Sequence, residues 1–395
     1  MAKCLVFLFV LCLGQSAFAQ VRFAGKVVDS TTGKPVPYVS VLVPATSLGT
    51  TSNADGEFEL LVPDQAQQVV FKELGYTSDT VRLRSKQPLL VKLKPAVVSL
   101  PEVQVPNYLE ALLLRAYRVL LRENATHTYG QAFYRQITRL DGEVTEVQEQ
   151  VWNAETSSAG VSGTQLVQGR YAEKKALLHF RNFSNYTKAI SFTPDPDSIA
   201  AKSLIGPNTS RYYTLKLLGV EQMGPQQLVE ISFASKAGVN PNHYTGSLVV
   251  DAVTGQTLRL RLNTPDFNMT SNNPTFKFKD GMVSLEYVLQ YGGRGPVLTY
   301  IKTGYTATVG RLFKPDLSLQ VATFAFFYDG QSMAPAGVVY QKPTANQADL
   351  DALKKAPYDA AFWQNYSVVK RTPLEDNIIK NFEKEKGFGT MLLQQ

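Results

Sequence analysis

Apolar and polar residues alternate with a period of two along most of this chain, which indicates β-strands that each bury one face. Between residues 21 and 95 the alternating runs are short and are separated by Gly, Pro, Asn and Asp. Turns are predicted at Asp29–Pro37, where carboxylate and hydroxyl groups can bond the backbone, and at Asn53–Gly56. About seven short strands in about 75 residues favour a small β-sandwich.

The pattern changes to a helical period near residue 107. Asn107 is predicted to begin the helix, with Glu110 completing an approximate capping box. Apolar residues three and four positions apart form one stripe, which is typical of a helix that packs on its own domain. The alternative is that such a stripe docks on a partner or a membrane. The stripe consists of Leu109, Leu112, Leu113, Ala116, Tyr117 and Leu120.

Long alternating runs follow the helix and predict an antiparallel meander that continues to residue 328. Asp141–Gly142 marks one of its hairpins. The predicted fold class is therefore mainly β with α+β character. It consists of an N-terminal β-sandwich followed by a helix packed on a large antiparallel sheet, which is either open or curved into a half-barrel.

Two strands of this meander each place apolar side chains on a single face. We treat these faces as a candidate site for a lipid or another apolar ligand, enclosed by the concave side of the sheet. The alternative is that they bury the helix at 109–121. The candidate residues are Leu258, Leu260, Leu262, Leu285, Tyr287, Leu289 and Tyr291.

The pattern is mixed after residue 330. Tyr358–Tyr366 holds aromatic side chains that either bind a sugar or anchor the tail on the sheet. Leu374–Lys386 alternates acids and lysines and predicts an exposed helix that stops at Gly387.

Residues 1–19 have the organisation of a secretory signal peptide, with a positive residue, a short apolar run and an A-x-A cleavage site that ends at Ala19. Lipidation of Cys12 is the alternative, but Leu11 stands where that process requires a small residue. No later run is long and apolar enough to predict a transmembrane helix in the mature chain. We therefore expect an exported protein that is periplasmic or associated with the outer membrane.

The expected domain organisation follows from these changes of pattern. It is a signal peptide at 1–19, a β-sandwich at 20–95, a linker at 96–106, a helix-plus-sheet domain at 107–330, and a tail with short helices at 331–395.

Composition adds two constraints. The formal net charge is +7, and the Lys and Arg residues are scattered along the chain. This charge has two interpretations: a basic surface that faces anionic lipid or polysaccharide, or ordinary charge that keeps the protein soluble. A nucleic-acid partner is not expected for an exported chain. Both cysteines, Cys4 and Cys12, lie in the predicted signal peptide, so the mature chain offers no disulfide and no thiolate metal ligand.

Three stretches of the first domain carry a family resemblance: GKVVDSTTGKPVPYVSVLV, GTTSNADGEFEL and FKELGYTSDTVRL. They resemble the carboxypeptidase regulatory-like domain, a transthyretin-like β-sandwich. Such domains occur beside zinc carboxypeptidases and at the N-termini of Gram-negative envelope proteins, including TonB-dependent receptors. In this chain Gly33 and Gly56 would hold turns and Phe58 would fill the core. The resemblance covers residues 21–95 and implies an envelope location.

The segment YTGSLVVDAVTGQTLRLRL is similar to the repeated hairpin of half-barrel proteins of the outer-membrane lipoprotein carrier type. The helix with LRENATHTYGQAFYRQ, together with the tail PYDAAFWQNYSVVKRTPLEDNIIKNFEKE, resembles an uncharacterised family of bacterial envelope proteins. These resemblances imply no known chemistry.

Zinc carboxypeptidase chemistry requires a His with a Glu three positions later, and none of His127, His179 and His243 has that Glu. A G-x-S-x-G serine elbow is absent from the sequence. The residues after the first domain are too few for the barrel of a TonB-dependent receptor. We therefore expect no catalytic residues, no metal ligands and no cofactor.

The leading hypothesis is a non-enzymatic cell-envelope protein with a binding or structural docking role, whose partner is an envelope protein, a lipid or a glycan. One alternative is a carrier of a lipid or another apolar ligand in a half-barrel. The other is a hydrolase that acts on glycan or peptide with unidentified residues, because paired carboxylates meet only in space.

Overall fold

The computed structural model describes residues 20–391 except 45, 47, 64–65, 84–87, 97, 100–106, 177, 181, 190–203, 224, 239–242, 271–273, 293–294, 344–348, 357 and 367. The predicted signal peptide and most of the predicted linker lie outside the described residues. Contacts divide the chain into two units. The first unit is Met1–Lys94 with Val368–Lys370, and the second is Pro95–Ser367 with Arg371–Gln395.

The first unit is built from two sheets, with strand orders β4-β1-β7 and β3-β2-β5-β6. Its first strand pairs antiparallel with β4 and parallel with β7. Valine and phenylalanine side chains from both sheets form one buried core, including Val27, Val41, Phe58 and Phe71. The predicted β-sandwich is confirmed. The strands are β1 (Gln20–Asp29), β2 (Ser40–Leu42), β3 (Gly49–Thr51), β4 (Glu57–Pro63), β5 (Gln68–Lys72), β6 (Asp79–Arg82) and β7 (Leu89–Leu93).

Both predicted turns of the sandwich form for local chemical reasons. The Asp29 carboxylate accepts the backbone N–H groups of Thr31 and Thr32 at 2.8 and 2.7 Å. Gly56 has φ +73°, and a Cβ at this position would collide with the backbone oxygen of Val27. This turn therefore requires glycine for conformation and for space.

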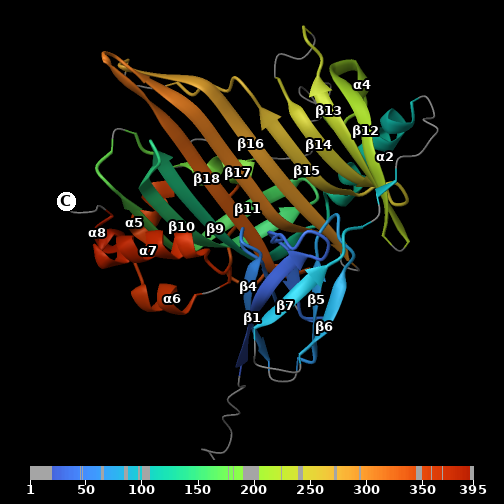
Figure 1. Cartoon of the computed structure of the whole chain (residues 1–395), viewed down its shortest axis with the longest axis horizontal. Helices are drawn as coiled ribbons and strands as arrows, with labels where there is room; N and C mark the ends of the chain where they lie inside the picture. Colours follow the sequence, from blue (N-terminus) through green and yellow to red (C-terminus); the bar gives the residue numbers. More distant parts are fainter. Residues whose placement is uncertain are drawn as a thin grey trace, which may run out of the picture. The chain divides into compact units, whose positions relative to one another are not determined.

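The second unit contains one antiparallel sheet of eleven strands in the order β11-β10-β9-β18-β17-β16-β15-β14-β13-β12-β8. The sheet is open, with β11 and the two-residue β8 at its edges. Figure 1 shows the long strands β16, β17 and β18 crossing its middle. The predicted class, mainly β with a helix on a large antiparallel sheet, is confirmed. The strands are β8 (Val98–Ser99), β9 (Thr128–Leu140), β10 (Glu143–Ser157), β11 (Gly160–Glu173), β12 (Tyr213–Met223), β13 (Gln226–Ser235), β14 (Thr245–Asp251), β15 (Thr257–Thr264), β16 (Phe276–Gly292), β17 (Gly295–Arg311) and β18 (Lys314–Gln331).

Helix α2 (Tyr108–Glu123) contacts β12 and β14 and lies near the yellow-green end of the sheet in Figure 1. Its stripe buries Leu112, Leu113, Ala116 and Leu120 in the main core of the unit. The predicted capping box is wrong. Asn107 does occupy the cap position, but it has φ 68° and its side chain makes no hydrogen bond to the helix. The Glu110 carboxylate instead accepts a hydrogen bond from the Ser210 hydroxyl at 2.5 Å.

The tail forms short helices near one edge of the sheet, where α5 (Asp349–Lys355) and α8 (Gly387–Thr390) contact the edge strand β11. Helix α7 begins with a capping box between Thr372 and Glu375. The prediction that this helix is exposed is wrong for one face, because Ile378, Ile379 and Phe382 share a core cluster with β9, β10 and β11 side chains. No helix in the described part of the chain is long and apolar enough to cross a membrane. The remaining helices are α3 (Phe183–Ala189), α4 (Thr209–Tyr212), α5 (Asp349–Lys355), α6 (Ala360–Asn365), α7 (Pro373–Lys384) and α8 (Gly387–Thr390).

Candidate functional site

The apolar face predicted from sequence lies on β15 and β16. Its members Leu260, Leu285, Tyr287 and Leu289 are buried, and Leu262 and Tyr291 are partly buried. All six belong to the core cluster that also contains the α2 stripe.

The seventh candidate, Leu258, is buried but lies outside that cluster. The register between β14 and β15 shifts at this point, since Val249 pairs with Arg259 and Val250 with Thr257. Leu258 is therefore the extra residue of a β-bulge, a feature that strict alternation in the sequence does not reveal.

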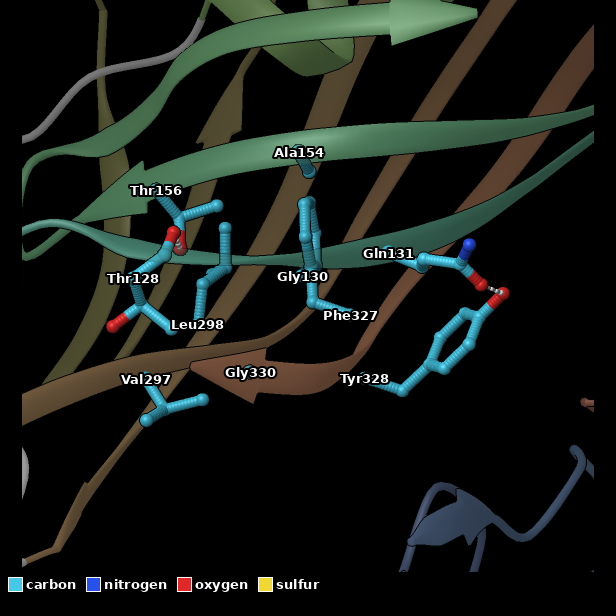
Figure 2. A pocket seen from close by; sticks show the side chains of 10 residues that line it. All are labelled: Thr128, Gly130, Gln131, Ala154, Thr156, Val297, Leu298, Phe327, Tyr328 and Gly330. Carbon is cyan, nitrogen blue, oxygen red and sulfur yellow. Dashed lines mark hydrogen bonds between the residues drawn. The ribbon is translucent and has the colours of Figure 1, made fainter. Parts of the chain in front are cut away.

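A small cavity lies among β9, β10, β17 and β18 (Figure 2). Its volume is about 20 Å³, which is room for about one water molecule. Figure 2 shows that Leu298 and Phe327 line it, while the Tyr328 hydroxyl at its side donates to Gln131 at 2.9 Å. An acyl chain cannot fit in this space.

A network of charged side chains is centred on Glu149, a fully buried residue of β10 near the β11 edge of the sheet. Its carboxylate accepts from Arg135 Nε of β9 at 2.7 Å and from the Arg170 guanidinium of β11. Arg371 approaches to 3.8 Å. Burial alone would raise the pKa of Glu149, but the three guanidinium groups outweigh it and lower the pKa to about 2.

The same arginines hold the tail. Arg135 pairs with Glu375 at 3.2 Å and Arg170 with Glu383 at 2.8 Å, and both glutamates belong to α7. The Arg170 guanidinium also lies 4.5 Å from the ring centroids of Trp363 and Phe388. Each charged group of this network has an oppositely charged partner, and the pairs join α7 to strands β9 and β11.

A second cluster lies nearby on the same two strands. Glu146 of β10 and Glu173 of β11 are directly opposite in the antiparallel register, and both are buried. The Tyr171 hydroxyl lies 2.9 Å from Glu146 Oε1 and also contacts Glu173 Oε2. His179 Nδ1 lies 3.0 Å from Glu173 Oε2 and 3.5 Å from Glu146 Oε1.

Backbone contacts orient this second cluster. The Phe180 N–H donates to both oxygens of Glu146 at 3.0 Å. Burial, with the nearby Glu146 and Glu173, raises the pKa of Tyr171 far above its usual range, so the phenol stays protonated. The ligand atoms of Glu146, Glu173 and His179 all lie within 4.8 Å of one another, and they form the one such group of His, Cys, Asp and Glu found among the described residues.

Sequence reasoning missed this cluster because it searched for a glutamate close to each histidine along the chain. The glutamates come instead from two other positions that only strand pairing joins. The remaining histidines are different. His127 lies 3.0 Å from Glu155 at a partly exposed position, and His243 lies 3.9 Å from the exposed Asp266.

Comparison with known proteins assigns the first domain. Residues 23–105 match the family model of the CarboxypepD_reg-like domain. The chain carries a carboxypeptidase regulatory-like domain at its N-terminus. The domain's sequence resemblance is thereby confirmed. A TonB-dependent receptor P3 of Formosa agariphila is 31% identical over 107 residues. That match spans 27% of this chain and 11% of the length of the receptor.

The solved structures that resemble this chain do so with low TM-scores. A DUF1329 family protein from Desulfovibrio piger has 11% identity and a TM-score of 0.24, covering 58% of this chain and 94% of its own. A LolA superfamily protein from Nitrosomonas europaea has 9% identity and a TM-score of 0.22, covering 59% of this chain and 97% of its own. Scores this low carry no argument about mechanism.

Proposed function

We propose that this chain is a non-enzymatic protein of the cell envelope, located in the periplasm or at the outer membrane, with a binding and docking role. The regulatory-like domain supports this proposal because it is a non-catalytic domain type, and a TonB-dependent receptor is 31% identical to this chain over 107 residues. The second unit would be a rigid platform that meets a lipid surface.

The packing of the sheet favours a platform over a lipid carrier. A carrier needs an apolar pocket large enough to enclose most of its ligand. Here the candidate apolar face joins the α2 stripe in one core cluster. The cavity in Figure 2 has space for about one water molecule.

The observation that carries the proposal is the tip of the β17–β18 hairpin. Arg311 pairs with Lys314, so the loop consists of Leu312 and Phe313 alone. These side chains are 63% and 96% exposed. The tip extends past β9, whose pairing with β18 begins at Leu319, whereas β16 pairs with β17 as far as Arg311.

Leu and Phe are unusual residues for a two-residue hairpin loop. Two-residue hairpin loops favour Asn-Gly and similar pairs, because their backbone needs positive φ. Phe313 adopts φ 59°, which is costly for a bulky side chain, and its exposure returns no burial energy. A strained, exposed aromatic that the fold does not use is an indication of function.

The chemistry around the tip matches an anionic bilayer. Arg311 and Lys314 flank the two apolar side chains. Arg311 Nε donates to the carbonyl of Pro315 at 2.7 Å, which holds this cation beside the turn. Apolar side chains that enter the interface, with cations at headgroup level, are the two components of reversible membrane binding.

Vesicle co-sedimentation tests the proposal. The mature protein is expected to sediment with phosphatidylglycerol-containing vesicles and less with neutral vesicles. Burial of a large apolar side chain contributes about 1.5–3 kcal/mol, so the Leu312→Ser/Phe313→Ser double variant should bind at least about tenfold more weakly. Met333→Ser, at a 78% exposed position, is the matched control and should bind normally. Equal sedimentation of the double variant, or capture of a protein partner without vesicle binding, would refute the lipid-surface role.

A further inference from the structure

A polar cavity of about 380 Å³ lies against four neighbouring strands of the second unit. These strands are β9, β18, β17 and β16 in the order of the sheet, and the β9–β10 turn contributes Gly142 to the cavity wall. A volume of this size is within the range of small-molecule pockets. The polar side chains that line the cavity are those of Arg139, Asp280, Thr306, Thr308, Ser318 and Gln320.

Strand pairing brings most of these side chains to one face of the sheet. Arg139 of β9 is directly opposite Gln320 of β18, and Gln320 is in turn opposite Thr306 of β17. Ser318 and Thr308 form the pair two residues closer to the hairpin tip. Directly opposed residues of antiparallel strands project from the same face, so a guanidinium, an amide and three hydroxyl groups meet there.

A bulge of β16 brings Asp280 to the cavity. The pairing of β16 with β17 shifts between Lys279 and Met282, so Asp280 and Gly281 together face one residue of β17. Asp280 has φ 52°, a conformation that Asp adopts more readily than most residues. A Cβ at position 281 would lie 2.1 Å from the backbone oxygen of Phe267, so close packing specifies this bulge. Bulges redirect side chains and are frequent beside functional sites.

The six polar side chains of the cavity are available to a ligand. Within the described part of the chain, none of them makes a side-chain hydrogen bond or an ion pair. The adjacent charges differ in this respect, because Lys279 and Asp316 are paired with each other at 3.3 Å. The cavity therefore presents one cation, one anion and several neutral donors, and its two opposite charges favour a zwitterionic ligand.

This set of groups matches a molecule that carries both a phosphate and a primary ammonium group. A guanidinium binds phosphate through paired hydrogen bonds, and a carboxylate accepts strong hydrogen bonds from an ammonium group. A single carboxylate is too few for a calcium site. No aromatic ring is among the described residues that line the cavity, so the trimethylammonium group of choline would lack its usual partners.

The spacing of the two charges fits such a ligand. Two strands separate β9 from β16, which places their backbones about 14 Å apart. The Arg139 and Asp280 side chains reach into the cavity from its two sides. They leave between them a gap that a phosphate and an ammonium group joined by two carbons can bridge.

The cavity also lies close to the proposed membrane anchor. Thr308 precedes Arg311 by three residues, so the cavity begins about 10 Å from the hairpin tip at the rise of a strand. Apolar groups of interfacial segments enter a bilayer by about 5–10 Å. Insertion of the Leu312 and Phe313 side chains to that depth would bring the cavity to the level of the headgroups.

We propose that this cavity binds the headgroup of a phospholipid with a phosphate and a primary ammonium group, as in phosphatidylethanolamine. Arg139 holds the phosphate together with the neighbouring hydroxyl groups, and Asp280 holds the ammonium group. This inference rests on the proposed function, because the tip brings the cavity to the bilayer. The tip supplies general affinity for the membrane, and the cavity selects the headgroup.

The test compares two sets of vesicles with the same fraction of phosphatidylglycerol, one completed with phosphatidylethanolamine and the other with phosphatidylcholine. The mature full-length protein should bind the phosphatidylethanolamine vesicles about tenfold more tightly, the factor expected for one hydrogen bond between charged groups. Asp280→Asn should remove this preference. Asparagine also tolerates positive φ, so the bulge is preserved.

A second measurement uses soluble glycerophosphoethanolamine, followed by nuclear magnetic resonance titration. It should bind the wild type, and Arg139→Gln should weaken this binding by about tenfold. The matched controls are Arg118→Gln and Asp351→Asn at exposed positions outside the cavity, and both should bind as wild type does. Circular dichroism checks the fold of each variant.

Equal affinity for the two vesicle sets together with no binding of the soluble compound would overturn the proposal. A preference that survives in folded Asp280→Asn and Arg139→Gln variants would overturn it too. Binding of the soluble compound without a vesicle preference would support the cavity as a site for a free zwitterion. The Leu312→Ser/Phe313→Ser variant should still bind the soluble compound, so failure of the membrane anchor and failure of the cavity give different results.

Discussion

Replacement of Glu149 by glutamine tests whether the buried charged network stabilises the fold. The amide keeps the volume of the carboxylate but leaves Arg135, Arg170 and Arg371 without their shared anion. The pKa of Glu149 is about 2 in the folded protein, against 4.5 for the unperturbed group. At about 1.36 kcal/mol per pKa unit, this difference corresponds to roughly 3 kcal/mol of stability.

The pH dependence gives this prediction its sign. A carboxyl group whose pKa is lower in the folded state stabilises the fold above its unfolded pKa, and that contribution is lost as the pH falls through the folded pKa. The free energy of unfolding should therefore differ by roughly 3 kcal/mol between wild type and Glu149→Gln near pH 7. The gap should narrow steadily between pH 5 and pH 2.

Urea unfolding at several pH values measures the effect. The matched control is Asp316→Asn, which removes a carboxylate from a pair with Lys279 in which the two side chains are 44% and 53% exposed. Exposed pairs contribute about 0–1 kcal/mol, so this control should change little. The reasoning is refuted if Glu149→Gln is as stable as the control at pH 7, or if its gap from wild type does not depend on pH.

Three other substitutions test the packing. Gly56→Ala should destabilise the first unit in thermal unfolding by more than Gly33→Ala, because both glycines have positive φ but a Cβ meets open space at Gly33; equal losses would show that φ alone matters. Leu113→Ala should cost about 2–5 kcal/mol in urea unfolding, whereas Leu121→Ala, at a 45% exposed position, should cost far less. Phe382→Ala should cost about 3–5 kcal/mol and speed proteolysis of the tail; a tail as resistant as in wild type would contradict its docking through α7.

The sequence predicted those features that depend on residues close together in the chain. The Asp29 turn, the glycine at position 56 and the amphipathic stripe of α2 were readable because a few neighbouring side chains decide each of them. The alternation in the meander likewise predicted that Leu260, Leu285 and Tyr287 face inward, because a strand's side-chain period is fixed by its backbone. It did not reveal the bulge at Leu258. The capping box failed because Asn107 adopts the left-handed conformation, with φ 68°, and its side chain makes no hydrogen bond to the helix.

Tertiary structure alone decided what the inward faces meet and where charges gather. In the sequence, nothing distinguishes Glu149 from the other polar residues of its strand. The pairing of β9, β10 and β11 brings the guanidinium groups of Arg135 and Arg170 to its carboxylate. Glu146, Glu173 and His179 come together because two antiparallel strands align in one register and the following chain folds back over them. Alternation specifies a face but not its partner, since strand order and register depend on contacts between residues far apart in sequence.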